Sequence, residues 1–402
     1  MDTRVVDLFA GAGGLSLGAT EAGARVEHAI ELDEWAGKTL EANHPDTRVT
    51  CADIRRLDDS WIRREIEKYP ALLVGGPPCQ GFSRAGPARK DPRDPRNSLF
   101  REFVRFAREL EPTAVVLENV PGILRSHTAS GHLVVEIIQQ ELRNLGYTTQ
   151  VLVLDAENFG VPQIRRRIFV LGLPPKATAV VELTHSDSGP TLFGSTEEPV
   201  LTLRDAISDL PIVDVGDIAE PVRYLGPPGN DFQRAMRDRS GDWLWNHVPM
   251  RHTARIVERF KHIRPGQSQS DVIADHAPRR RVRSPEQGVG TYDQNNRRMF
   301  WDAPCHTLAA SFYANFIHPD LDRNFTVREG ARIQTFPDWY VFKGKATVVS
   351  QKLLAREGRH DERHLCQYAQ VGNAVPPKLA RVVVGAVLEG IGGSEKPETL
   401  SA

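Results

Sequence analysis

The amino-acid sequence predicts a doubly wound α/β domain followed by a second, smaller domain. From residue 3 to about residue 173, short apolar runs alternate with amphipathic stretches, which is typical of a parallel sheet covered by helices. A glycine-rich turn follows the first apolar run, at the place where such sheets bind ligands. After Pro174 the periodicity fades, and proline, glycine, aromatic and basic residues intermix until about Phe325, which indicates a change of domain.

The individual elements follow from these patterns. Leu99, Phe103, Phe106 and Leu110 recur at spacings of three and four, as a one-sided surface helix requires, and a similar spacing runs from Leu133 to Leu145. Near the C-terminus, Pro376 and Pro377 precede KLARVVVGAVLEG, a helix that we expect to return to the first domain. The predicted strands are Arg4 to Phe9, Val26 to Ile30, Ala71 to Gly75, Ala114 to Leu117, Thr149 to Leu154 and Ile168 to Leu173.

Composition excludes several classes of protein. The 402 residues are 40% hydrophobic and 26% charged, and no apolar run approaches the roughly 18 residues of a membrane span. The N-terminus shows no basic leader followed by an apolar stretch, so we expect a cytoplasmic location. The four cysteines lie far apart without a CxxC pair, so neither a disulfide framework nor a metal site is expected.

Charge is unevenly distributed along the chain. The net charge is −1, yet residues 221–300 hold 15 Arg or Lys and 8 Asp or Glu, a local net charge of +7. Such a segment is either a solvated arginine-rich surface or a patch that faces phosphates, and charge alone does not separate the two.

The segment VVDLFAGAGGLSLG predicts a nucleotide-type ligand site. Gly11, Gly13 and Gly14 follow a strand and precede a helix, where glycine lets the backbone approach a ligand closely. Glu31, at the end of the second strand, is placed to accept hydrogen bonds from the two ribose hydroxyls of an adenosyl group, and Asp53 from its adenine amino group. The G-x-G-G spacing lacks the third glycine of the NAD fingerprint, which favours S-adenosylmethionine over NAD.

The segment LLVGGPPCQGFS predicts a nucleophile. An apolar strand runs into Pro77 and Pro78, and Cys79 follows at the carboxyl end of the sheet. The prolines fix the backbone and prevent a helix from starting, so a rigid turn presents the thiol. An isolated cysteine is usually a buried and inert thiol, and it is the neighbouring motifs that favour the catalytic interpretation.

Six motifs, in this order, resemble those of DNA cytosine-5 methyltransferases. The resemblance covers about residues 1–175 and 303–390, and its ordered set is far more specific than any single motif. It implies a Rossmann-like class I S-adenosylmethionine-dependent methyltransferase domain with a target-recognition domain. The motifs are DLFAGAGGLSLG, GGPPCQGFS, ENV at 118–120, QIRRR at 163–167, REGARIQTFPD at 328–338 and QVGNAVPP at 370–377.

By this resemblance, Cys79 adds to C6 of cytosine while Glu118 contacts N3 and the exocyclic amine. C5 is a poor nucleophile, but thiolate addition at C6 with charge relief at N3 makes it able to take a sulfonium methyl. Glu118 must then be protonated or share a proton with N3. Strand alternation puts Arg165 and Arg167 on one face with Gln163, and the resemblance places both arginines at the pocket, holding O2 and favouring the thiolate, with Asn119 framing it.

The resemblance also implies the residues around the cofactor. Leu32 stands where the family often has a larger aromatic side chain. The implied contacts, beside the three glycines, Glu31 and Asp53, are Phe9, Leu32, Ile54, Pro78, Leu99, Asn373 and Ala374.

Contacts with DNA are expected in two regions. A target cytosine inside a duplex is unreachable, so the enzyme must extrude it, and the basic loop beside Cys79 is suited to grip the backbone and close over the base. The basic region 221–300 is interpreted as the core of the target-recognition domain. The expected contacts are Gln80, Ser83, Arg84, Arg89, Lys90 and Arg96 in the loop, and Arg279, Arg280, Arg281, Arg283, Arg297 and Arg298 in the second domain.

The predicted organisation has four parts and leaves other functions open. A catalytic and cofactor-binding domain spans 1–175, a target-recognition domain 176–325, returning motifs 326–392 and a tail 393–402, with an apparent insertion within 343–369. An RNA cytosine-5 methyltransferase and a catalytically silent DNA-binding subunit are the alternatives. We expect a monomer on double-stranded DNA, in restriction-modification, in another phage defence or acting alone.

Overall fold

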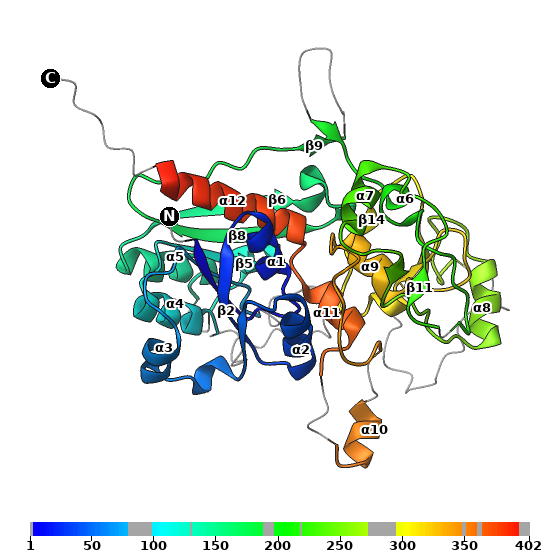
Figure 1. Ribbon diagram of the computed structural model, residues 1–402, viewed down its shortest axis with the longest axis horizontal. Coiled ribbons are helices and arrows are strands. Elements are labelled where there is room, and N and C mark those ends of the chain that lie inside the picture. Colours follow the sequence, from blue (N-terminus) through cyan, green and yellow to red (C-terminus); the bar gives the residue numbers. More distant parts are fainter. Residues whose placement is uncertain are drawn as a thin grey trace. The chain divides into compact units, whose positions relative to one another are not determined.

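The chain forms two compact units in the computed structural model (Figure 1). The first consists of Met1–Val200 and Ala374–Ala402, and the second of Leu201–Asn373. The structure describes residues 3–78, 99–128, 131–187, 197–217, 219–271, 295–347, 351–359 and 364–393.

The first unit is built on one large sheet with helices on both sides. Its strands are β1 (Arg4–Leu8), β2 (Arg25–Glu31), β3 (Arg48–Cys51), β4 (Leu72–Gly75), β5 (Ala114–Asn119), β6 (Thr148–Asp155) and β8 (Arg166–Leu173), with the short strands β7 (Gln163–Ile164), β9 (His185–Ser186) and β10 (Glu198–Pro199) outside it. Its helices are α1 (Gly14–Glu21), α2 (Glu34–Asn43), α3 (Asp59–Glu65), α4 (Leu99–Leu110), α5 (Val134–Asn144) and α12 (Pro377–Gly393), with the 3-10 helices η1 (Ile54–Arg56), η3 (Pro121–Arg125) and η4 (Ala156–Phe159).

The strand order is β3-β2-β1-β4-β5-β8-β6. The five strands from β3 to β5 pair in parallel, whereas β8 runs antiparallel to both β5 and β6. The doubly wound α/β prediction is confirmed, with one antiparallel strand that the apolar pattern did not reveal. Periodicity reports which residues are buried and carries no information on strand direction. The carboxyl ends of β1, β4 and β5 therefore meet at one edge of the sheet.

The two faces of the sheet carry separate hydrophobic cores. Side chains alternate along β4, so that Leu72 and Val74 pack in one core and Leu73 packs in the other. The first core includes residues of α1 and α12, and the second includes residues of α3, α4 and α5. Helix α12, which the sequence led us to expect beside the first domain, belongs to the first unit (Figure 1).

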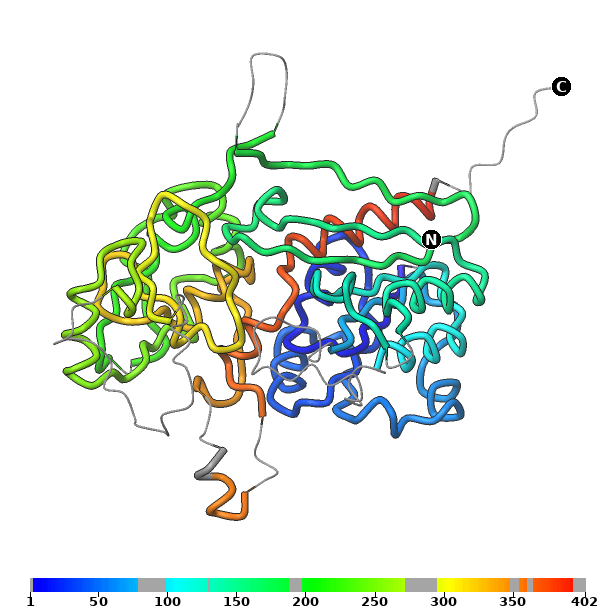
Figure 2. Tube along the Cα trace, turned by 180° about the vertical axis from the view of Figure 1, so that it is seen from behind, coloured from blue at the N-terminus to red at the C-terminus, as the bar shows by residue number. Residues whose placement is uncertain are grey.

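The first unit extends beyond the predicted boundary at residue 175. Ala177 and Ala179 are buried in the core beneath α12, and Gln150 Nε2 of β6 donates to Ala179 O at 2.9 Å. Figure 2 shows this segment running beside β6 and α12. The apolar alternation of residues 177–179 is too short to distinguish this segment from an irregular linker. The sequence alone therefore does not predict that it belongs to the first unit.

The second unit is held together by buried ion pairs. Helix α9 (Val327–Ile333) begins with a capping box between Thr326 and Glu329, and Arg332 forms a 2.6 Å ion pair with Asp338 where both side chains are fully buried. Its other elements are α6 (Leu203–Ile207), α7 (Asp231–Arg237), α8 (Ala254–Lys261), α10 (Gln351–Arg356), α11 (Gln367–Asn373), η6 (Phe312–Ala314), β11 (Val222–Arg223), β12 (Trp243–Leu244), β13 (Arg297–Arg298), β14 (Cys305–His306) and β15 (Phe316–Ile317).

The predicted return of residues 326–392 to the first domain is correct only from Ala374 onward. Both α9 and α11 belong to the second unit, because the charged side chains of REGARIQTFPD pair within it. Helix α10 lies in the 343–369 insertion, and the predicted tail lies outside the described residues apart from residue 393. Among the described residues, no helix is both long and apolar enough to cross a membrane.

Candidate active site

The glycine turn between β1 and α1 has a backbone that few residues tolerate. Gly11 has φ +56° and Gly13 has φ +83°, and Phe9 adopts a left-handed φ of +57° that is rare for a residue with a large side chain. Strain of this kind costs about 1–3 kcal/mol and is concentrated at ligand sites. An added Cβ at Gly11 would meet no atom within 4 Å, so this side of the turn is open.

Glu31 is the carboxylate that faces this turn. Its Oε2 accepts from the Gly11 amide at 2.7 Å and its Oε1 accepts from the Asp33 amide at 2.8 Å. Burial raises the pKa of Glu31, and these amide hydrogen bonds oppose the rise. Each carboxylate oxygen keeps a second lone pair, so hydrogen bonds from ribose hydroxyls are compatible with the turn that Glu31 fixes.

Gly14 has a packing role. A Cβ at this position would lie 2.2 Å from the carbonyl oxygen of Val375, at the entry to α12. Glycine is therefore required here for the close approach of two backbones, and the contact of Gly14 with the cofactor stays a prediction.

Gly14→Ala is expected to lower the free energy of unfolding by about 1–3 kcal/mol, because a backbone oxygen must move to admit the methyl group. Gly385→Ala in α12 is the matched control, since a Cβ there meets no atom within 4 Å. Removing a helix glycine should stabilise the protein by roughly 0.5–1 kcal/mol. Urea unfolding of the two variants measures both effects, and equal stability of the two would contradict the packing role.

The other predicted cofactor residues of the first unit follow strands of the sheet or begin the next helix. Asp53 caps η1, and both its carboxylate oxygens accept from Arg55, which lowers the pKa of Asp53. Ile54 is buried, whereas Leu32 is 67% exposed, so its side chain is accessible for packing against a planar group. Leu99 begins α4 and Pro78 follows β4. The contacts of these residues with the cofactor stay predictions, as does that of Asn373 at the end of α11.

Sequence reasoning missed Asp7, which precedes the glycine turn. It is fully buried, its Oδ2 accepts from Ser16 Oγ at 2.6 Å, and its Oδ1 has no hydrogen-bond partner within the described part of the chain. Burial raises the pKa of Asp7 to about 7. A buried acceptor beside an open glycine turn fits a ligand with a cationic group, as the amino group of S-adenosylmethionine is. An acidic residue two positions before the turn was the signal available in the sequence.

Glu118 and Arg167 form an ion pair at the carboxyl end of β5. Glu118 pairs with Phe169 across β5 and β8, and alternation puts Arg167 on the same face as Phe169. Arg167 Nε lies 2.9 Å from Glu118 Oε1, with both side chains 12% exposed. Burial raises the pKa of Glu118, while Arg167 and Arg165 oppose the rise. The carboxyl group is therefore easier to protonate than an ordinary glutamate.

Arg165 is buried on the same face, and Arg166 points to solvent, as alternation predicted. Arg165 Nη1 donates to Gln163 Oε1 at 3.3 Å, and Nη2 donates to Ala374 O at 3.0 Å. Ala374, predicted to contact the cofactor, thus also anchors the arginine through its carbonyl group. Glu157, which the sequence did not single out, accepts from the Arg165 amide at 3.2 Å.

Asn119 connects this cluster to the turn before the predicted nucleophile. Its Nδ2 donates to Pro77 O at 3.1 Å, and its Oδ1 accepts from the Val120 amide at 2.9 Å. A Cβ at Gly76 would lie 3.1 Å from Glu118 Oε2, so β4 leaves room for the carboxylate. Cys79 itself lies outside the described residues, and the chain reaches Pro78 beside the Glu118 cluster.

The predicted DNA contacts are only partly described. Arg298 was predicted to face DNA, and this is wrong, because its side chain is buried. Its Nη2 donates to Phe260 O at 2.7 Å and its Nε donates to Ile263 O at 2.6 Å, and it also pairs with Asp322. Arg297 is half-buried and donates to Gly266 O at 2.6 Å. Outside the described residues lie Gln80, Ser83, Arg84, Arg89, Lys90, Arg96, Arg279, Arg280, Arg281 and Arg283.

Arg298→Met is expected to lower the free energy of unfolding by about 3 kcal/mol or more, because it leaves Asp322 and several buried carbonyl groups without their donor. Arg297→Met, the neighbouring control, should cost about 1 kcal/mol. Urea unfolding measures both. An unchanged stability for the Arg298 variant, together with weaker DNA binding, would restore the surface interpretation.

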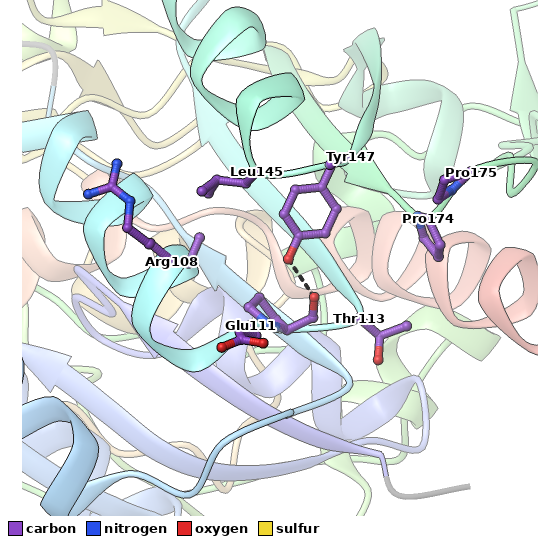
Figure 3. Close-up of a pocket in the computed structure, with 10 residues that line it drawn as sticks. Arg108, Glu111, Thr113, Leu145, Tyr147, Pro174 and Pro175 are labelled. Atoms are coloured by element: carbon purple, nitrogen blue, oxygen red, sulfur yellow. Dashed lines mark hydrogen bonds between the residues drawn. The ribbon is translucent and has the colours of Figure 1, made fainter.

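A surface cavity of about 290 Å³ lies away from this cluster, beside the residues that precede β5 (Figure 3). It is lined by residues including Arg108, Glu111 and Tyr147, whose Oη donates to Pro112 O at 2.5 Å. Because β5 begins at Ala114 and carries Glu118 near its other end, this cavity is separate from the candidate active site.

The fold and the site define a class I methyltransferase that uses S-adenosylmethionine. A parallel sheet carries a glycine turn and a ribose-type carboxylate after β1 and β2, and a carboxyl and arginine cluster after β5. Residues 3–389 match the family model for C-5 cytosine-specific DNA methylases. The chain therefore belongs to this family, and it is a DNA (cytosine-5)-methyltransferase, as its motifs predicted.

Two relatives agree with this assignment, and a solved structure shares the fold. The type II methyltransferase M.DdeI of Desulfomicrobium norvegicum is 43% identical over 380 residues, covering 94% of this chain and 87% of the relative. M.AgeI of Thalassovita gelatinovora is 32% identical over 447 residues, covering 96% and 99%. The S. pombe Dnmt2 methyltransferase has a TM-score of 0.57 at 18% identity, covering 97% and 99%, and this likeness concerns the fold alone.

Proposed function

We propose that this chain methylates C5 of a cytosine extruded from duplex DNA, with Cys79 as the nucleophile and Glu118 as the acid at N3. The observation that supports this most directly is the hydrogen bond from Asn119 to Pro77 O. It joins the strand that carries Glu118 to the backbone two residues before Cys79. A base attacked at C6 by Cys79 would then present N3 to Glu118.

Glu118 supports this chemistry through its protonation. Addition of the Cys79 thiolate to C6 breaks the C5–C6 double bond and drives electron density toward N3 and C5. A proton delivered by Glu118 to N3 neutralises the developing charge, and the raised pKa of Glu118 makes that proton available at higher pH than an ordinary glutamate would. Once C5 has taken the methyl group, the C5 proton is lost to water and its bonding electrons restore the C5–C6 double bond. The thiolate leaves C6, and N3 returns its proton to Glu118.

Arg165 and Arg167 supply positive charge beside this carboxyl group. When Glu118 is protonated, the cluster carries two positive charges, which favours the thiolate of Cys79 and holds the O2 oxygen of the base. Both guanidinium groups are buried or nearly so, where the interaction with an anion is stronger than in water. Gln163 and Ala374 anchor Arg165 before substrate arrives, and Arg167 is held beside it by its ion pair with Glu118.

S-adenosylmethionine supplies, when bound, an electrophilic sulfonium methyl group and leaves as the neutral thioether S-adenosylhomocysteine. The residues that would hold it are those of the glycine turn with Glu31 and Asp7, whose Oδ1 has no hydrogen-bond partner among the described residues. Glu31 is already fixed by two backbone amides, so it needs no rearrangement to accept ribose hydroxyls.

The three described cysteines lack the surroundings of an activated nucleophile. Cys305 and Cys366 are buried, and burial raises the pKa of the Cys305 thiol. Cys51 is exposed, but partial burial and the nearby carboxylates of Glu41 and Glu31 raise its pKa as well. A thiol with a raised pKa is a poor nucleophile, which supports the role of Cys79.

A methyl-transfer assay with two nucleic acids tests the substrate. The purified chain, radiolabelled S-adenosylmethionine and either genomic duplex DNA or transfer RNA are incubated, and we expect label in the DNA alone. Label in transfer RNA alone would establish the RNA alternative, and no label in either would favour the silent-subunit alternative. Bisulfite sequencing of DNA from cells that express the protein then identifies the recognised sequence.

The biological setting proposed is restriction-modification in the cytoplasm, where a cognate nuclease cuts DNA that lacks the methyl group. Support comes from the relatives named as type II methyltransferases. DNA from expressing cells should resist a nuclease encoded beside this gene and be cut when the Cys79→Ala variant replaces the wild type. A monomer acting on one DNA site is the proposed assembly.

A further inference from the structure

A cluster of cations surrounds helix α8, at the periphery of the second unit (Figure 1). Residues 251–264, RHTARIVERFKHIR, contain four arginines and one lysine but a single acid, Glu258, so their net charge is +4 with neutral histidines. Arg251, Arg255, Lys261 and Arg264 are exposed, and we call these four side chains the α8 basic face.

Helix α8 is attached to its unit by buried apolar side chains at its C-terminal end. Phe260 and Ile263 are buried against Ile317 of β15. The buried guanidinium of Arg298 caps the C-terminal end of α8, because it donates hydrogen bonds to the carbonyl groups of Phe260 and Ile263. An arginine predicted to touch DNA therefore acts from the interior, as a positioning residue for the basic face.

The charge pattern of α8 works against its own stability. Arg255 and Arg259 are four residues apart on the helix, and like charges at this spacing destabilise a helix. Burial and the charge of Arg255 together lower the pKa of Arg259. Glu258 is engaged by Lys261 at 3.0 Å and by His262 at 3.3 Å, so it does little to offset the arginines. An anionic partner would turn this repulsion into attraction.

We propose that the α8 basic face binds backbone phosphates of the duplex that carries the target cytosine. This rests on the proposed function, which supplies duplex DNA as the substrate. Arg255 lies on α8, and Arg251 and Arg264 lie beside its two ends. Exposed arginine side chains suit phosphate contacts, which set the position of a protein on DNA without reading its sequence. The face is thus expected to contribute affinity that depends strongly on salt and little on the recognised sequence.

The test uses the full chain with Arg251→Gln, Arg255→Gln and Arg264→Gln combined, and a short fluorescein-labelled duplex of arbitrary sequence. Anisotropy titrations at several salt concentrations give the slope of log Kd against log salt. Each lost phosphate contact lowers the magnitude of this slope by about 0.9, so the slope of the combined variant should be smaller by about two to three. At moderate salt its Kd should rise by about tenfold or more.

The matched control makes the same change in net charge elsewhere, with Arg63→Gln, Arg64→Gln and Arg143→Gln on α3 and α5 of the first unit. These side chains are exposed, and we expect the salt slope of this control variant to stay within about half a unit of the wild-type value. Equal slopes for the two triple variants would overturn the proposal. If the α8 variant unfolds more readily in urea, Arg255→Gln alone replaces it, with an expected loss of about one.

Methyl transfer separates failure of this inference from failure of the proposed function. If the wild-type protein methylates duplex DNA and the α8 variant keeps the wild-type salt slope and the wild-type KM for DNA, only the α8 contact is refuted. Wild-type protein without activity on duplex DNA would refute both. We expect the variant to keep the wild-type kcat at saturating DNA, since Glu118, Arg165 and Arg167 all lie outside α8.

Discussion

Cys79→Ala is expected to abolish methyl transfer, with a loss of at least ~10⁴-fold, while S-adenosylmethionine binds as before. Removing a covalent nucleophile eliminates the step that activates C5, and binding interactions alone do not replace it. The glycine turn and Glu31 hold their geometry through backbone hydrogen bonds that do not involve Cys79. Transfer of labelled methyl groups to duplex DNA measures activity, and calorimetric titration measures cofactor binding.

Cys51→Ala is the matched control, because it removes an exposed thiol at the end of β3 without touching the Glu118 cluster. It should keep wild-type activity. Duplex DNA containing 5-fluorocytosine offers an independent readout, since a fluorine at C5 cannot leave as a proton and the wild-type enzyme should remain covalently attached. Activity of the Cys79→Ala variant, or trapping by that variant, would contradict the proposed nucleophile.

The sheet was predictable from the sequence wherever burial alone decides structure. Strands such as β4 are apolar because both faces are covered, and this signal survives without any knowledge of neighbours. The direction of β8 was not predictable, since antiparallel and parallel strands bury the same residues. The domain boundary also depends on the packing of Ala177 and Ala179 under α12. Side chains as small as alanine give only a weak sequence signal that a segment is buried.

Arginines illustrate how far a site can be predicted. In QIRRR, alternation placed Arg165 and Arg166 on opposite faces. The structure agrees, because the extended chain that passes from β7 into β8 buries Arg165 and leaves Arg166 exposed. Arg298 lies in a strand of only two residues, so alternation has no register to follow, and its burial depends on carbonyl groups far away in sequence. Local periodicity therefore predicts side-chain direction within long strands and fails where tertiary contacts set it.

Glu118→Gln is expected to lower the rate of methyl transfer by about 10²–10⁴-fold and to change its pH dependence. The amide keeps the size of the side chain and can donate a hydrogen bond to N3, but it cannot deliver a proton. Binding of DNA and of S-adenosylmethionine should change little. Glu109→Gln, an ordinary ion-paired glutamate beside Arg63, is the control and should keep the wild-type rate.

The sign of the pH effect follows from the direction of the pKa shift. Glu118 acts in its protonated form, and burial raises its pKa, so this contribution is present below the raised pKa and is lost as pH rises through it. Cys79 acts as a thiolate, so its contribution grows with pH. The wild-type kcat should therefore rise and then fall with pH, whereas Glu118→Gln should show only the rise. A falling alkaline limb that persists in the variant would mean that another group carries the proton, and the Glu118–Arg167 pair would then serve only to orient the base.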